Sequence, residues 1–435
     1  MKVLVGVILF FLVGCADYAE VERVTFPATI GVDYDKESED INIFTRVTKG
    51  ISPVGEAGGG QRVIRGSGKT FMDALFETID KNLQVISWKH SDVVLVSEDL
   101  AKRGLINELD LLYRLDEVLI NAFLLITDED IEDVFDATLE IETTLPIPLA
   151  GVAEIKKQSK HVTDITIMDF LQDYLKAGKD PIVPSLKFKP KIEHDEEEKG
   201  KSEFEEDVDL KEDVDMNGSN EAGDDEILLP KQDQDEDGEF KQDNGASRKE
   251  DKVLEFAGLG IFKEDKFVGN LSKEESMGVM MVFGFDNARG ITISNRVEDE
   301  FDLVIDDVKS KSDIDTYLIG EGLGIRIDLD VRFNIAQHSI KKSIEYDEVE
   351  LINNEVENYL EGVLNSLIFK LQNEFGTDTL GLGERVFRQN TRYWMENKDR
   401  WDEIFPKVPI KVNVNAKLKS TGQLVDSFKK VSLEK

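Results

Sequence analysis

The chain has almost no cysteine and little histidine. Cys15 is the only cysteine among 435 residues, so no intramolecular disulfide can form and the folded part must be stabilised by its hydrophobic core. None of the four histidines has a metal-ligand spacing to another histidine or to the cysteine; they are His90, His161, His194 and His338. The sequence therefore argues against a disulfide-stapled module and against a zinc site built from a short motif.

A long apolar run and a basic face are also missing. The apolar stretch Val3 to Val13 is shorter than the roughly 20 residues that cross a bilayer, and no later segment reaches that length. With 53 Lys and Arg against 90 Asp and Glu, the net charge is −37. Because such a chain shows no basic face to neutralise phosphates, nucleic acid is disfavoured as a partner.

The position of the single cysteine is informative. Leu12, Val13 and Gly14 precede Cys15 directly, behind a short basic start and the apolar run, which is the pattern of a bacterial lipobox. We expect residues 1–14 to be a signal peptide and Cys15 to be the lipidated N-terminus of the mature protein. At least two acyl chains on that cysteine would suffice for stable anchoring in a membrane. The alternatives are an ordinary secretory signal with an incidental cysteine, or a short N-terminal helix.

The negative charge is concentrated in one segment. Residues 191–251 contain 25 Asp and Glu against 8 Lys and Arg, which gives 8 − 25 = −17 and leaves −20 for the rest of the chain. Because this composition buries little apolar surface, we expect a disordered insertion or linker there. Within it, Asp233, Asp235 and Asp237 resemble the start of an EF-hand loop, but Asn244 stands where the loop needs a bidentate glutamate.

Strand and helix patterns alternate before the acidic segment. Alternating β-branched runs at 24–34 and 40–48 predict a hairpin, and Thr70 can cap a helix with apolar residues at helical spacing. Buried strands are expected at 91–97 and 121–127, a short strand at 61–66, and helices at 99–114, 131–139 and 166–177. Residues 15–190 are therefore expected to form an N-terminal α/β domain.

The second half is richer in strand patterns. We expect strands at 254–262, 266–270, 278–285, 290–295, 301–308, 315–318, 324–334 and 408–418. A wide apolar stripe predicts one long helix over 346–375, and a further helix carries Trp394 and Trp401. The expected fold class is α+β and multidomain, with a small middle β region at 252–298 and a C-terminal domain at 299–435. In that last domain the long helix is expected to pack against an antiparallel sheet.

Sequence motifs for chemistry are weak. Gly66-Ser67-Gly68-Lys69-Thr70 resembles the end of a P-loop, but Val63 stands where that loop needs glycine, so a capped helix start is the better interpretation. No nucleophile elbow is present, and the histidines are scattered. We therefore expect no enzyme, and no catalytic, cofactor-binding or metal-binding residues.

The chain resembles the Ger(x)C lipoproteins, the C subunits of GerA-type nutrient germinant receptors of endospore-forming bacteria. The resemblance covers nearly the whole chain except the acidic segment, and it begins with the lipobox. The runs that carry it are Ala28 to Asp35, Gly66 to Thr70, His90 to Val96, Leu100 to Gly104, Gly258 to Lys263, Lys266 to Gly269, and Phe375 to Asp378 with Leu382-Gly383, Trp394, Trp401 and Phe405-Pro406. The chain departs from the family pattern in two places, which are Ala16-Asp17-Tyr18 after the cysteine and the acidic segment itself.

This resemblance implies a three-domain, non-enzymatic α+β protein on the outer surface of the spore inner membrane. It would assemble with a polytopic A subunit and a transporter-like B subunit and be required for nutrient-triggered germination. It supplies no catalytic residues to carry over. A membrane-anchored solute-binding lipoprotein serving a transporter is the alternative; it predicts two similar lobes around a polar cleft, whereas the two halves here are dissimilar. A surface hydrolase would need a nucleophile and base that the sequence does not show.

Overall fold

A computed structural model describes eleven stretches of the chain, namely residues 24–27, 29–48, 61–82, 85–115, 120–144, 164–190, 252–284, 288–294, 302–320, 322–338 and 346–420. Apart from Pro190 and Lys252, they belong to one compact unit. The signal peptide, Cys15 and the acidic segment 191–251 lie outside the described residues. Among the described residues, no helix combines the length and the apolarity needed to cross a membrane.

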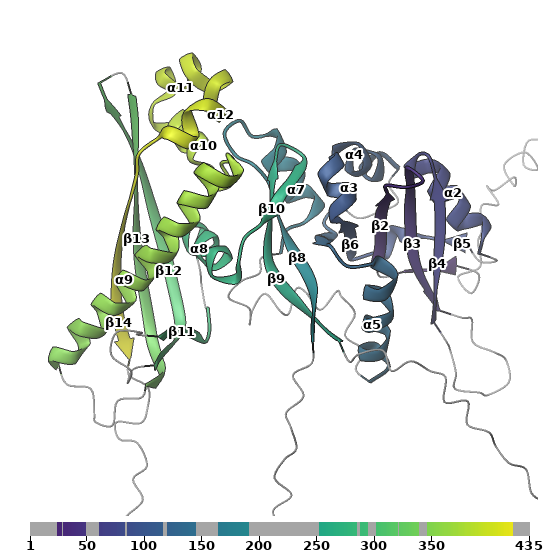
Figure 1. Cartoon of the computed structure of the whole chain (residues 1–435), viewed down its shortest axis with the longest axis horizontal. Coiled ribbons are helices and arrows are strands. Elements are labelled where there is room, and N and C mark those ends of the chain that lie inside the picture. The colour runs from purple at the N-terminus through teal and green to yellow at the C-terminus, as the bar shows by residue number, and fades with distance from the viewer. Residues whose placement is uncertain are drawn as a thin grey trace, which may run out of the picture. The chain divides into compact units, whose positions relative to one another are not determined.

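A mixed sheet of eight strands forms the N-terminal half (Figure 1). The strands lie in the order β10-β9-β8-β7-β6-β2-β3-β4. Strands β2, β6, β7 and β8 pair in parallel, and the pairs β2/β3, β3/β4 and β9/β10 are antiparallel. Their bounds are β2 Thr29–Asp35, β3 Asp40–Thr48, β4 Gln61–Gly68, β6 Val93–Ser97, β7 Phe123–Thr127, β8 Ile182–Pro190, β9 Lys252–Lys263 and β10 Lys266–Asn270. A small parallel pair, β1 Val24–Thr25 with β5 Val85–Ile86, lies outside this sheet.

The helices of this half begin where the sequence provides caps. Thr70 accepts a hydrogen bond from Asp73 N at the start of α2, as predicted, and Thr166 forms a capping box with Asp169 at the start of α7. The bounds are α2 Phe71–Asp80, α3 Glu98–Arg103, α4 Ile106–Leu115, α5 Ile131–Thr144 and α7 Ile167–Leu175. The single helix predicted at 99–114 is divided into α3 and α4, because Gly104 adopts a φ of +119° that ends the first helix.

Residues 278–285 are not the strand that their apolar run predicted. Residues 278–284 fall in α8, Lys273–Phe283, and in Gly284, which ends it, while residue 285 lies outside the described residues. Ser272 and Glu275 form a capping box that starts this helix. Because α8 is buried on most of its faces, its sequence lacks an amphipathic period, and a short apolar run then looks the same in a helix as in a strand.

The C-terminal half is built on a four-stranded sheet in the order β11-β12-β13-β14. The strands are β11 Ile291–Ser294, β12 Asp302–Ile319, β13 Gly322–His338 and β14 Ile410–Ser420. The first three are antiparallel, as predicted, whereas β14 runs parallel to β13. This departure follows from the connection between them, since a parallel neighbour needs a long crossover and the remaining helices supply it. The two strands predicted at 301–308 and 315–318 are one strand, β12.

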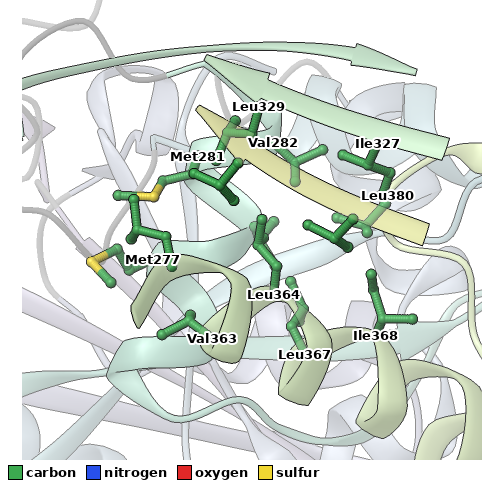
Figure 2. Close-up of a cluster of buried hydrophobic side chains, with 14 of the residues drawn as sticks. Met277, Met281, Val282, Ile327, Leu329, Val363, Leu364, Leu367, Ile368 and Leu380 are labelled. Carbon is green, nitrogen blue, oxygen red and sulfur yellow. The ribbon is translucent and has the colours of Figure 1, made fainter. Parts of the chain in front are cut away.

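The long predicted helix lies across this sheet (Figure 1). Helix α9, Tyr346–Lys370, continues as a π-helical turn, Leu371–Phe375, and Gly376 ends it with a φ of +62°. Its apolar stripe packs with α8 and β13 in one core, as Figure 2 shows for Met281, Ile327 and Leu364. The helices that follow are α10 Leu382–Gln389, α11 Thr391–Asn397 and α12 Trp401–Ile404.

Helix side chains close both edges of the C-terminal sheet. On the β14 edge, Asn353, Glu357 and Glu361 of α9 accept hydrogen bonds from the backbone N–H of Leu418, Ala416 and Val414, over 2.9, 2.9 and 3.1 Å. Every fourth residue of the helix thus meets every second residue of the strand. On the β12 edge, the Gln389 amide bonds Ile314 O and Thr316 N over 2.7 Å each. These contacts satisfy groups that an open edge would leave free.

Candidate functional site

The structure does not describe the lipobox residues Leu12, Val13, Gly14 and Cys15, so the lipidation site stays a prediction from the sequence. His161 and His194 also lie outside the described residues. His90 is exposed, and its ring contacts Phe26 edge-on with the centroids 5.1 Å apart. Across the described part of the chain, no group of three His, Cys, Asp or Glu side chains is placed to hold a metal ion.

The segment that resembles a P-loop joins β4 to α2 and serves their packing. A Cβ at Gly66 would overlap Thr78 and the carbonyl of Ala74, so glycine lets the strand approach the helix closely. The Ser67 N–H donates to Glu77, while Lys69 Nζ lies 2.9 Å from Asp40 Oδ1. Because these donors already have partners within the fold, the segment has little left to offer a phosphate.

The residues of the second half that carry the family resemblance meet the loop after α7. The Asp180 carboxylate is the meeting point. It accepts hydrogen bonds from Thr377 Oγ1 at 2.6 Å, from Asp378 N at 2.9 Å and from Glu264 N at 2.9 Å. Thr377 Oγ1 also lies 2.8 Å from Phe262 O. One carboxylate thus ties together the loop after α7, the β9–β10 turn and the segment after α9.

Asp378 is the buried partner in this cluster, with 2% of its surface exposed. Its carboxylate accepts from Leu382 N at 2.9 Å, Gly383 N at 2.7 Å and Trp401 Nε1 at 3.1 Å. Burial raises the pKa of Asp378 to about 7, and the nearby Asp180 acts in the same sense, while the three N–H donors oppose the rise. The carboxylate therefore orders the start of α10 and holds the Trp401 indole.

Close backbone packing completes this cluster, which we call the Asp180–Asp378 junction. Gly178 and Gly383 touch, since a Cβ at Gly383 would lie 2.7 Å from Gly178 Cα and 2.9 Å from the Trp394 ring. Trp394 and Trp401 contact each other edge-on, with centroids 5.4 Å apart. Both tryptophans are buried. Any side chain larger than hydrogen at either glycine would push the loop after α7 away from α10.

The Asp180–Asp378 junction is suited to fixing structure, because both carboxylates accept hydrogen bonds from other parts of the protein. The sequence placed Trp394 and Trp401 on a helix, whereas Thr377 and Asp378 were singled out by the family resemblance, without a role. Asp180 and Gly178 were missed. Their only local signal is a Gly-Lys-Asp-Pro turn after a helix, and one aspartate in so acidic a chain carries little information.

Two family models match the chain on either side of the acidic segment. Residues 17–188 match the model described as the spore germination protein N-terminal domain. Residues 257–422 match the model described as spore germination B3/GerAC like, C-terminal. The first match therefore includes Asp180, and the second includes Asp378 and the other junction residues that follow the acidic segment.

Individual relatives are distant in sequence. The spore germination protein YndF of Bacillus subtilis (strain 168) is 21% identical over 173 residues, which are 39% of this chain and 43% of YndF. Spore germination protein B3 of the same organism is 26% identical over 185 residues, 41% of this chain and 48% of B3. Each alignment thus spans less than half of the relative. The crystal structure of the GerBC protein matches with a TM-score of 0.50 at 15% identity, over 89% of this chain and 96% of that one, which shows a shared fold.

Proposed function

Because the chain belongs to the GerAC-like family of spore germination proteins, we propose that it is the C subunit of a nutrient germinant receptor. The observation that carries the proposal is the match of both family domains, in order, to residues 17–188 and 257–422. This family is not a known enzyme family. We propose that the protein acts through contacts with other receptor subunits and catalyses no reaction.

The proposed receptor has three kinds of subunit. This chain would assemble with a polytopic A-type subunit and a transporter-like B-type subunit on the outer surface of the spore inner membrane. A protein without a catalytic cluster can change a receptor only by contacting its states differently. The Asp180–Asp378 junction supports this role, since it holds the loop after α7, the β9–β10 turn and the segment after α9 in one arrangement.

Deletion of the gene tests the proposal. Spores that lack this protein and contain no receptor able to substitute are expected not to germinate with the cognate nutrient. They should respond normally to dodecylamine, because that trigger bypasses nutrient receptors. Release of dipicolinic acid reports both responses. Normal germination with every nutrient tested would refute the receptor role.

Cys15 is proposed as the anchor on the basis of the Leu12 to Cys15 lipobox. Cys15→Ala is expected to leave an unprocessed precursor and to lower the amount of assembled receptor, because the chain loses its only expected lipid attachment. Mass spectrometry of the N-terminus and immunoblots of spore membranes measure the two effects. A mature N-terminus upstream of an unmodified Cys15 in the wild-type protein would contradict the assignment.

A further inference from the structure

The end of the β12–β13 hairpin is apolar and exposed. Tyr317, Leu318 and Ile319 are the last three residues of β12, and 42%, 53% and 55% of their surfaces are accessible. We call these three residues the hairpin tip. Single exposed apolar side chains are ordinary on a protein surface, but three in succession at the end of a hairpin form a patch of the kind that marks a contact site.

The hairpin tip is apolar on both faces of the strand pair. Because side chains alternate along a strand, Tyr317 and Ile319 lie on one face and Leu318 lies on the other, where it is paired with Leu323. Contact with a flat surface would cover only one of these faces. A partner that covers all three side chains must therefore surround the tip, as a pocket or the interior of a bilayer does.

The base of the tip is held in place beside α10 and α11 (Figure 1). The Thr316 N–H donates to Gln389 Oε1 at 2.7 Å, and the Asn390 amide donates to Thr316 O at 3.1 Å and to Thr316 Oγ1 at 2.6 Å. The Tyr317 ring lies against Gly324, since a Cβ there would come within 2.6 Å of the ring. Because the tip is already ordered, little conformational freedom is left to lose on binding.

The charges around the tip favour a protein pocket over a bilayer. Residues 311–330 contain five acidic and two basic side chains, so their charge is 2 − 5 = −3. One of the acids, Glu321, stands in the sequence between Gly320 and Gly322, where the chain turns from β12 to β13. A carboxylate beside the apolar residues opposes insertion into hydrocarbon, and anionic lipid headgroups repel the surrounding negative charge. A pocket that carries a basic group can instead pair with this carboxylate.

We propose that the hairpin tip inserts into an apolar pocket with a basic group, on one of the membrane-embedded subunits of the receptor. The three apolar side chains would contact the walls of the pocket, and the Glu321 carboxylate would meet the basic group. Tyr317 is the expected main anchor, since tyrosine is frequent among the residues that dominate binding energy. This inference rests on the proposed receptor role and adds the surface through which the chain contacts its partner.

Site-specific photocrosslinking in spores tests the proposal. A tagged full-length chain with p-benzoylphenylalanine in place of Leu318 is expected to form a covalent adduct with a membrane-embedded receptor subunit, which mass spectrometry identifies after purification. The same amino acid in place of Leu351 is the matched control, because Leu351 is a leucine of α9 with a similar exposed fraction, 59%. The control should give no such adduct. If the chain labelled at position 318 formed adducts with lipid alone, or with no receptor subunit, the proposal would be overturned.

A charge placed in the tip gives a second test. Leu318→Asp and Tyr317→Asp should each lower the amount of receptor subunit that copurifies with the tagged chain at least fivefold, whereas Leu351→Asp should leave it unchanged. Thermal melting should show all three variants folded, since the replaced side chains are exposed. Equal copurification with the wild type and both tip variants would overturn the tip as the contact and leave the receptor role intact. If the wild type itself copurified no subunit, the receptor role would be refuted, and this inference with it.

Discussion

A few single residues hold distant segments of the chain together. The sequence correctly predicted Thr70 as a helix cap, because capping depends on neighbours three residues away. It could not predict that Asp180 and Asp378 would share one cluster, because their contact joins segments far apart in the chain. Local chemistry is therefore readable from the sequence, whereas the partners of a buried carboxylate are set by the fold.

The raised pKa of Asp378 predicts a specific pH dependence of stability. The folded protein holds the proton up to about pH 7, while the unfolded chain releases it near 3.8. Protonation therefore favours the folded state, and the contribution of Asp378 to the free energy of unfolding should fall as pH rises from about 4 to about 7. In Asp378→Asn this titration is absent. Denaturant unfolding of both proteins at pH 4.5, 6 and 8 should show the wild type losing stability relative to the variant.

Trp401→Phe is the companion variant for this measurement. It removes the indole N–H that donates to Asp378 and keeps an aromatic ring in the core. Because that donor lowers the pKa of Asp378, its loss should move the pH-dependent fall to higher pH. Equal pH profiles for the wild type and Asp378→Asn would contradict the assignment of a buried, titrating carboxyl.

Two glycines should respond to alanine in opposite directions. Gly66→Ala places a Cβ against Ala74 and Thr78 of α2, and such overpacking costs about 1–3 kcal/mol of unfolding free energy. Gly362→Ala lies on the exposed side of α9 with nothing within 4 Å of the new Cβ, so it should stabilise the helix by about 0.5–1 kcal/mol. Chemical denaturation of both variants measures the difference. A stabilising Gly66→Ala would show that α2 does not pack against β4 as described.

Helices could be predicted from the sequence where one face is apolar and the other is polar. The stripe of α9 identified a long helix, because one face is buried and the other is exposed. Helix α8 was mistaken for a strand because almost all its faces are buried, which removes the period. The polar residues Asn353, Glu357 and Glu361 gave no signal in advance, since their spacing suits any solvated helix face. Their role becomes visible only beside the β14 edge.

Glu357 tests the closure of that edge. Glu357→Ala removes the acceptor for the backbone N–H of the buried Ala416 and should destabilise the protein by about 1–3 kcal/mol. Glu357→Gln keeps a carbonyl oxygen as acceptor and should restore most of the loss. The exposed Asn358→Ala should change the free energy of unfolding by less than about 0.5 kcal/mol. If Glu357→Ala and Asn358→Ala were equally mild in denaturation experiments, the edge contact would contribute little.

At the scale of the whole molecule, the sequence predicted the fold class but not the strand order. Runs of alternating strands and helices indicated mixed sheets with packed helices, and the structure has them. Strands β8 and β9 are neighbours although the acidic segment separates them in sequence, and β14 follows β13 in the described chain only after the helices α9 to α12. Neither pairing can be predicted from the local sequence pattern, because each joins strands that are far apart in the chain. The separate middle β region predicted at 252–298 and the lipid anchor at Cys15 remain proposals.

The central claim is that this chain works as one subunit of a membrane receptor. Affinity purification of the tagged, full-length chain from detergent-solubilised spore membranes tests it most directly. Mass spectrometry of the purified material is expected to identify one A-type and one B-type germinant receptor subunit in comparable amounts. Purification of the chain without either subunit, or with the permease and ATPase of a transporter in their place, would contradict the account.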